Sequence, residues 1–320
     1  MKNVLFTSAL LCAFLFTSCN DDDPISQAQF APPTQQQFTS LKESAYNNIR
    51  QTFTVDASQY IMVTSQKGVT LSFALGSFTY NGSVVTGNVD IEFVEIFDRG
   101  TMLATGMSTM GLTNSAEKAL IISGGEFYIN ATQNGHQLDA YFIELAVPCE
   151  LTGGPDNEMG LWFGIEAESD IVWEEDDNVN GQKQGVWQKG GVYYAYFNQF
   201  GWTNVDRWYS DPRPKTTIQV GVPDGFDNTN SAVYLAYNDE DNALAVLDTY
   251  DAEKGLFSEH YGQTPIGLEC SVIFVSENNG EWIYAIQSVT ITENGIITFE
   301  DADLQTATEE ELIVLINALP

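Results

Sequence analysis

Apolar and polar residues alternate along most of the chain, which is the pattern of strands that bury one face. In the stretch GNVDIEFVEIF, the side chains of Val89, Ile91 and Phe93 should point to one side of a strand and the acids between them to the other. The stretches GGEFYINATQNGHQLDAYFIELAVP, GVYYAYF, SAVYLAYN and EWIYAIQSVTIT repeat this form. They do not alternate with helical segments as a parallel α/β sheet requires, so the sequence predicts a mostly β fold.

Asn-Gly pairs at 81–82 and 134–135 interrupt two of these runs. Both residue types tolerate the positive φ of a type I′ turn, so each pair predicts a tight hairpin. Turn residues recur at short intervals through the rest of the chain, which is typical of antiparallel sandwiches and barrels. We therefore expect two antiparallel β-sandwich-like domains.

Helical spacing occurs near the two ends of the chain, where it predicts short helices. The first is an amphipathic segment with apolar residues three or four positions apart, at Phe38, Leu41, Ala45, Ile49 and Phe53. The second is TATEEELIVLINALP, in which Thr308 is the expected N-cap and Glu311 completes a capping box.

A polar stretch, EEDDNVNGQKQG, separates two strand-rich halves of the chain. We therefore expect the first β domain, with the N-terminal helix, over residues 38–175. The second β domain, with the C-terminal helix, should cover residues 186–320. Residues 19–37 are rich in proline and glutamine, and this composition predicts a flexible tether.

Residues 1–18 have the three-part form of a secretory signal peptide. Lys2 is followed by the apolar run Val4–Phe16 and by the small residues Thr17 and Ser18. The apolar run is shorter than the ~20 residues that a membrane-spanning helix needs. The small residues lead directly into Cys19, an arrangement that resembles a bacterial lipobox, so Cys19 is the predicted site of lipidation.

Three aspartates follow Cys19 after a single asparagine. This acidic run resembles the export signal of Bacteroidota lipoproteins that reach the outer face of the outer membrane; the alternative is a solvated spacer. The predicted location is the cell envelope, as an outer-membrane lipoprotein exposed at the surface and held to the membrane by its N-terminal lipid.

The chain is strongly acidic, with 44 Asp and Glu residues against 12 Lys and Arg and a formal net charge of −32 at pH 7. Such a field repels nucleic acid, so the sequence excludes nucleic acid as a partner. The hydrophobic fraction of 43% is too high for a disordered acidic chain.

Cys149 and Cys270 are candidates for a disulfide, because an oxidising envelope compartment permits one. The alternative is two separate buried thiols that pack as small apolar groups. The sequence leaves both readings open.

The chain holds two histidines and contains no GxSxG, HExxH or CxxC motif, so no motif in it indicates a serine hydrolase or a zinc site. Carboxylates are abundant, and a glycan-acting hydrolase with paired carboxylates is the alternative reading. Glu92 and Glu95 are three positions apart and should point to opposite faces of a strand. The prediction is a protein that is not an enzyme and needs no cofactor.

The stretch DDNVNG supplies Asp176, Asn178 and Asn180 in the spacing of the first half of a calcium-binding loop. Trp187 then occupies the position where such a loop places its bidentate glutamate. Calcium is therefore a weak candidate ligand, and a solvated acidic loop is the alternative.

The stretch FGWTNVDRWY concentrates aromatic residues beside an arginine. Trp202, Trp208, Tyr209 and Arg207 are the candidate ligand-binding residues, because exposed aromatic rings with nearby polar groups suit the faces of sugar rings. The alternative is that these large side chains fill a β core.

Two regions resemble a recurrent module of Bacteroidota surface lipoproteins. They are VVTGNVDIEFVEIFDRGTMLATGMSTMG followed by LIISGGEFYINATQNG, and the later YFNQFGWTNVDRW. The module is similar to ZU5-type β-sandwich domains, and its family has no assigned reaction. The resemblance implies a location and an architecture. With the lipid anchor and the acidic β domains, it leads us to expect a glycan or another envelope protein as the partner, or else a purely structural scaffold.

Overall fold

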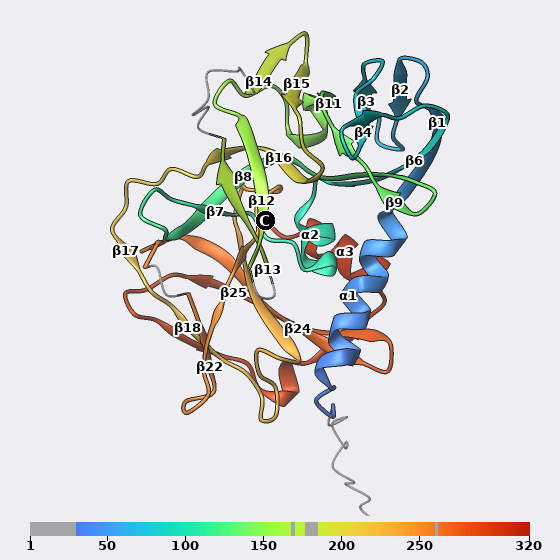
Figure 1. Ribbon diagram of the computed structural model, residues 1–320. Coiled ribbons are helices and arrows are strands. Elements are labelled where there is room, and N and C mark those ends of the chain that lie inside the picture. The colour runs from blue at the N-terminus through green and yellow to red at the C-terminus, as the bar shows by residue number, and fades with distance from the viewer. Residues whose placement is uncertain (1–29, 168–169, 177–184, 260–261) are drawn as a thin grey trace, which may run out of the picture.

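The computed structural model describes residues 30–167, 170–176, 185–259 and 262–320 (Figure 1). The fold is mostly β, as the alternation predicts, with several sheets and, in the described residues, the helices α1 (Gln35–Ile49), α2 (Arg99–Thr105) and α3 (Glu309–Asn317). We name the sheets A to F. The signal peptide and Cys19 lie outside the described residues.

Sheets A and B contain strands from the first two thirds of the chain. Sheet A has the order β1-β6-β8-β16-β12-β13-β7, and β9 pairs with β8. Its strands are β1 (Gln51–Asp56), β6 (Asn88–Ile96), β7 (Met110–Leu112), β8 (Lys118–Gln133), β9 (His136–Gln137), β12 (Gly160–Ala167), β13 (Asp170–Glu175) and β16 (Gly201–Trp208). Sheet B has the order β14-β15-β11-β3-β2, from β2 (Ile61–Thr64), β3 (Thr70–Phe73), β11 (Ile143–Pro148), β14 (Gly185–Lys189) and β15 (Val192–Phe197).

Sheets A and B share one hydrophobic core, which we call the first core. Phe93 of β6 and Phe127 of β8 contribute from sheet A, and their rings lie 6.0 Å apart. Leu71 of β3, Leu145 of β11 and Phe197 of β15 contribute from sheet B. The small sheet C packs beside them, from β4 (Phe78–Tyr80), β5 (Ser83–Val84) and β10 (Asp139–Ala140).

Sheets D, E and F are built from residues after 210, and sheets E and F share the second core. Sheet D pairs β17 (Lys215–Thr216) with β23 (Thr264–Pro265). Sheet E is β21-β22-β18-β26, from β18 (Gln219–Gly221), β21 (Thr249–Asp251), β22 (Leu256–Ser258) and β26 (Ile296–Thr298). Sheet F is β20-β19-β24-β25-β27, from β19 (Ser231–Tyr237), β20 (Ala245–Val246), β24 (Glu269–Asn278), β25 (Glu281–Thr290) and β27 (Gln305–Ala307). Phe257 of sheet E and Phe274 of sheet F pack in this core.

The third core lies where the helices meet the remaining faces of sheets A and F (Figure 1). In β24, Phe274 points into the second core while its neighbour Ile273 points into the third, so this strand is buried on both faces. Trp162 and Trp173 of sheet A and Trp282 of sheet F are fully buried in the third core.

Helix α1 begins earlier than the sequence indicates. Thr34 is its N-cap and forms a capping box with Gln37, so the last residues of the expected tether over 19–37 belong to the helix. Phe30 also packs against the second core. The helix ends at Ile49, and Phe53, expected in the helix, lies in β1 and pairs with Ile91.

The C-terminal helix and both Asn-Gly turns confirm their predictions. Thr308 caps α3 and forms the expected capping box with Glu311. Asn81 and Asn134 have φ values of 50° and 51°, as the first position of a type I′ turn requires. The glycines that follow have φ values of 75° and 78°.

Helix α2 was not expected from the sequence, and it carries the most deeply buried arginine of the described chain. Arg99 Nε donates to the carbonyl of Ile316 at 3.1 Å, and Nη1 donates to the carbonyls of Pro320 at 3.2 Å and Tyr237 at 3.4 Å. Nη2 donates to the carbonyl of Leu319. One side chain thus joins α2, the end of α3 and β19.

Helices α2 and α3 approach so closely at Gly100 that no side chain fits there. A Cβ atom at this position would lie 2.5 Å from the carbonyl oxygen of Ile313. The Gly100 N–H instead donates to Asn317 Oδ1 at 2.8 Å, and Asn317 Nδ2 donates to Asp98, the N-cap of α2, also at 2.8 Å.

The expected boundary between residues 175 and 186 does not match the strand pairing. Strands β15 and β16 follow that point, but β15 pairs with β11, and β16 pairs with β12 and β8, all of which precede it. Strand β14 joins sheet B through β15. At the polar stretch the chain passes from sheet A, at β13, to sheet B, at β14. The change to the later sheets comes after Trp208, where β16 ends.

The candidate disulfide between Cys149 and Cys270 is not formed. Both thiols are free and buried, Cys149 in the first core and Cys270 in the second. Burial in an apolar setting raises the pKa of Cys270 to about 12, which keeps it a neutral thiol at physiological pH. The alternative of two separate buried thiols describes this structure.

We expect Arg99→Met to destabilise the protein by about 3 kcal/mol, because it leaves buried carbonyls without their charged donor. Urea unfolding followed by circular dichroism measures this loss. Arg50→Met is the control, since Arg50 is half exposed and its ion pair with Glu92, at 3.7 Å, is a surface contact. That control should cost less than about 0.5 kcal/mol. Equal losses in the two variants would contradict the role given to Arg99.

Candidate functional site

The outer face of sheet B carries a row of aromatic side chains. In β15, Tyr193, Ala195 and Phe197 point into the first core, so Tyr194 and Tyr196 point outward by strand alternation. Trp187 of β14 lies directly across from Tyr194. We call the hollow that they border the aromatic groove. It is lined by Trp187, Lys189, Gly190, Val192, Tyr194 and Tyr196 and has a volume of about 600 Å³.

The rings of the aromatic groove stand close to one another, with Trp187 exposed and Tyr194 and Tyr196 half-buried. The Trp187 and Tyr196 ring centroids are 5.3 Å apart at an interplanar angle of 64°. Phe142 extends the row, with its centroid 5.8 Å from that of Tyr196 at 35°. Trp187 is 42% exposed and Phe142 39%. Large aromatic rings exposed together on one face are uncommon unless they serve binding.

Small side chains beside the aromatic row keep the rings accessible. Tyr194 lies across from Ala146 of β11, which in turn lies across from Thr70 of β3. Tyr196 lies across from Glu144, and Glu144 from Ser72. Apart from Glu144, these neighbours have short side chains. The aromatic rings therefore project further from the sheet than the side chains on the β11 side.

Glu144 and Lys189 supply charged groups at the two ends of the row. Burial, followed by the neighbouring Glu144 carboxylate, raises the pKa of Tyr196, which therefore keeps its hydroxyl proton. The Tyr196 hydroxyl can donate a hydrogen bond to a ligand, and the Glu144 carboxylate can accept one, beside the face of the Tyr196 ring. Lys189 lies across from Val192 and lines the groove at the other end. The arrangement suits a ligand with flat apolar faces and hydroxyl groups at its rim.

Trp202, one of the candidates from the sequence, is partly buried and packs against the third core. It packs in the third core against Trp173 with a centroid distance of 6.2 Å and against Tyr128 with one of 5.4 Å. The alternative that large aromatics fill a β core describes this residue.

Arg207, Trp208 and Tyr209 point to three different places. Arg207 Nε donates to Asp156 Oδ2 at 2.7 Å, on the face of β16 opposite to Trp208. Trp208 packs edge-on against Trp162 at 4.7 Å and donates from Nε1 to Glu175 Oε2 at 3.0 Å. Tyr209 lies beyond the strand and contacts Tyr237. The four candidates therefore do not form one site.

The candidate calcium ligands fall largely outside the described residues. Asn178 and Asn180 belong to the segment 177–184, which the structure does not describe. Asp176 borders a hollow with Trp208, Glu174 and Glu175. In the described part of the chain, no three His, Cys, Asp or Glu side chains are grouped to hold a metal ion. Calcium binding stays a prediction.

Sequence reasoning missed Trp187, Tyr194 and Tyr196 as a site, although the signal was present. GVWQKGGVYYAYF is a hairpin in which every second residue shares a face, so the three aromatics must lie together if Tyr193 and Phe197 are buried. The sequence does not show which face is buried. Asn-Gly turns and alternation fix the strands, but not the layer that covers them.

No family model matches this chain, and no curated protein matches it either. The aromatic groove and its neighbouring charges therefore carry the functional argument. Helices α1 to α3, which are the helices of the described residues, are too short or too polar to cross a membrane.

Asp206 is next in sequence to Arg207, one of the predicted ligand-binding residues, but it is buried away from solvent. It is fully buried, as is Glu126 on the neighbouring strand β8. Burial raises the pKa of Asp206 well above its usual value, and hydrogen bonding by Ser123, the Gly124 backbone and Asn204 opposes this shift only in part. Because this carboxyl is fully buried, we assign it a structural effect.

The raised pKa predicts that Asp206→Asn stabilises the protein at neutral pH. An acid whose folded-state pKa is raised contributes its full stability below its ordinary pKa, and that stability is lost as pH rises through the folded-state value. The asparagine variant has no such loss. Its advantage in urea unfolding should grow from pH 4 upward, by about 1.4 kcal/mol per pH unit until it levels off. Asp139→Asn, at an exposed position, is the control. An advantage of Asp206→Asn that does not change with pH would contradict this account.

Proposed function

We propose that this protein is a non-enzymatic, lipid-anchored protein of the cell envelope that binds a glycan in the aromatic groove. The supporting observation is the row of Trp187, Tyr194, Tyr196 and Phe142, which lies open on the outer face of sheet B. The apolar face of a sugar ring can stack on such rings, while its hydroxyls reach Glu144 or Lys189.

The charge of the chain narrows the proposed ligand to an uncharged glycan. The formal net charge of −32 repels anionic polymers at a distance, and among the described residues that line the groove Lys189 is the basic one. A neutral glycan is not repelled. Its binding should depend little on salt, because stacking and hydrogen bonds rather than ion pairs would hold it.

The anchor in this proposal rests on residues 1–23, where a signal peptide leads into Cys19 and an acidic run. We further propose that sheets A with B and E with F form two sandwich units, and that the first is the module that resembles ZU5-type domains. In this arrangement the lipid holds the chain at the outer membrane, on its outer face, where sheet B can meet extracellular glycans.

Trp187→Ala and Tyr196→Ala should each weaken glycan binding at least tenfold, because truncation of a central aromatic contact commonly has this effect. A glycan array identifies the ligand, and isothermal titration calorimetry measures its affinity. Tyr80→Ala is the matched control. Tyr80 is 40% exposed, close to the value for Trp187, but it lies in sheet C beside His136.

Two outcomes would overturn the glycan proposal. Glycan binding that persists in both groove variants would move the site elsewhere. If no glycan binds, but the wild-type chain captures an envelope protein that Trp187→Ala loses, the groove binds a protein instead.

Cys19→Ala should release the protein from the membrane fraction. Acyl chains on this thiol would contribute ~0.8 kcal/mol for each CH₂ buried in the bilayer, so two or three chains hold the protein firmly. Intact mass spectrometry of the wild type should show the added fatty chains, and the variant should lack them. A Cys12→Ala chain is the control, because Cys12 lies within the predicted signal peptide. A Cys19→Ala protein that stays membrane-bound would contradict the anchor.

A further inference from the structure

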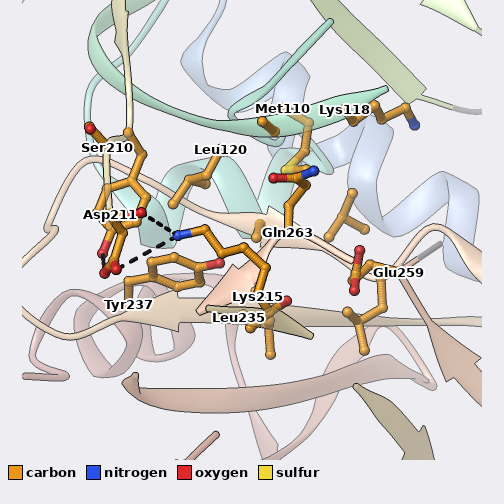
Figure 2. A pocket seen from close by; sticks show the side chains of 16 residues that line it. Met110, Lys118, Leu120, Ser210, Asp211, Lys215, Leu235, Tyr237, Glu259 and Gln263 are labelled. Atoms are coloured by element: carbon orange, nitrogen blue, oxygen red, sulfur yellow. Dashed lines mark hydrogen bonds and ion pairs between the residues drawn. The ribbon is translucent and has the colours of Figure 1, made fainter. Parts of the chain in front are cut away.

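A second, smaller pocket lies where the end of sheet A meets sheet F (Figure 2). It encloses about 210 Å³ and is separate from the aromatic groove, with which it shares no residue. Met110 of β7 and Leu120 of β8 reach it from sheet A. Leu235 and Tyr237 of β19 reach it from sheet F.

One part of the pocket wall is apolar and is built from strands. Met110, Leu120, Leu235 and Tyr237 all belong to the second core, as does Ala245 of β20. Each is buried, and each sits on a strand rather than on a loop. A cavity of about 150 Å³ lined by aliphatic and aromatic side chains is enough to bind benzene. The pocket therefore has room for one six-membered ring with a small substituent.

One side of the pocket holds an ammonium group in a fixed position. Lys215 Nζ donates to the backbone carbonyl of Asp211 at 2.5 Å and lies 3.7 Å from Asp211 Oδ1 (Figure 2). Asp211 is itself held by Arg213, whose Nε donates to it at 3.0 Å, and by the Tyr209 hydroxyl at 3.1 Å. These hydrogen bonds keep the pKa of Asp211 far below its usual value, so its charge persists.

Lys215 has donor capacity left for a ligand. A lysine ammonium carries three N–H donors, and within the described residues its polar partner is Asp211. Arg213, which does not line the pocket, is paired with Asp211 and offsets its charge. Lys215 therefore leaves this side of the pocket locally cationic in a chain that is acidic as a whole.

The opposite side of the pocket carries an acidic side chain. Glu259 lines it there (Figure 2). Its Oε2 accepts a hydrogen bond from the Gly262 N–H at 2.8 Å. Lys118, also at that side, is bound to Asp248 at 2.7 Å, and both side chains are largely buried. An anionic head group is thus favoured at Lys215 and repelled at Glu259, which gives a bound molecule one orientation.

We propose that this pocket binds a small monocarboxylate with a ring-sized apolar body. The ring lies among Leu120, Leu235 and Tyr237, and the carboxylate accepts a hydrogen bond from Lys215 Nζ. No covalent step is involved. This site is independent of the glycan proposal, because it uses other residues and another class of ligand.

A series of three one-ring probes tests the proposal on the full-length protein in 0.15 M NaCl. Benzoate, benzyl alcohol and benzylamine share the ring and differ in the charge of the head group. Ligand-observed NMR and isothermal titration calorimetry should show that benzoate binds at least tenfold more tightly than benzylamine, as a charge-assisted hydrogen bond requires. Absence of benzoate binding, or equal binding of benzylamine, would overturn the proposal.

Lys215→Met separates recognition of the carboxylate from recognition of the ring. The variant keeps an unbranched side chain and loses the ammonium, so it should bind benzoate at least tenfold more weakly and benzyl alcohol as the wild type does. Lys254→Met is the matched control and should leave benzoate binding unchanged, because Lys254 is a surface lysine paired with Asp251 and lines neither the pocket nor the aromatic groove. Benzoate affinity that is equal in Lys215→Met and in the wild type would overturn the assignment.

Ala245→Leu tests whether the probes bind inside the pocket. The larger side chain fills part of the space, so all probes that bind the wild type should lose affinity, while the circular dichroism spectrum stays that of the wild type. If the variant fails to fold, chemical-shift changes in the wild type decide the question. Benzoate-induced shifts confined to residues remote from β19 and β20 would contradict the location.

Discussion

The buried guanidinium of Arg99 holds together parts of the chain that are far apart in sequence. It donates to carbonyls at the end of α3 and to β19, while its own helix, α2, follows directly from β6 of sheet A. A buried cation is tolerated only when its donors are satisfied, and here backbone oxygens at the end of α3 and in β19 satisfy them. The third core forms around this point, because Met102, Leu103, Leu312 and Ile316 lie on the same two helices. The relative placement of sheets A and F depends on it.

This placement determines which surfaces remain for binding. Sheet A is covered on one face by sheet B and on the other by the helices and sheet F, so its aromatic residues are committed to packing. Within the described residues, the first core covers one face of sheet B, and the outer face carries Trp187 and Tyr196. The small pocket of Figure 2 also results from the placement of sheets A and F. It lies where the end of sheet A meets sheet F, and Met110 and Leu120 of sheet A belong to the second core.

In this chain the sequence predicts turns, caps and strands better than it predicts which strands pair into one sheet and which sheets pack together. Both Asn-Gly turns, the alternation in β6 and the cap at Thr308 follow from the preferences of a few neighbouring residues, and the structure has them. Helix α2 had comparable signals, with Asp98 at its N-cap and Gly106 in the left-handed conformation at its end. Its seven residues were too few to show a helical period. Nothing local reveals that β14 to β16 return to the earlier sheets, because strand pairing is a long-range choice.

The same limit explains why FGWTNVDRWY is not a site although its composition suits one. In a strand, adjacent side chains point to opposite faces, so Arg207 and Trp208 cannot converge on one ligand without a bend in the backbone. Trp202 and Trp208 do share a face, but it is the face that packs in the third core. The GVWQKGGVYYAYF hairpin differs. Tyr194 and Tyr196 are two positions apart in β15 and share its outer face, and Trp187 of β14 lies directly across from Tyr194, so the three rings come together. An aromatic cluster in a β protein therefore becomes a binding surface through the parity of its positions and the absence of a covering layer, and not through its density along the chain.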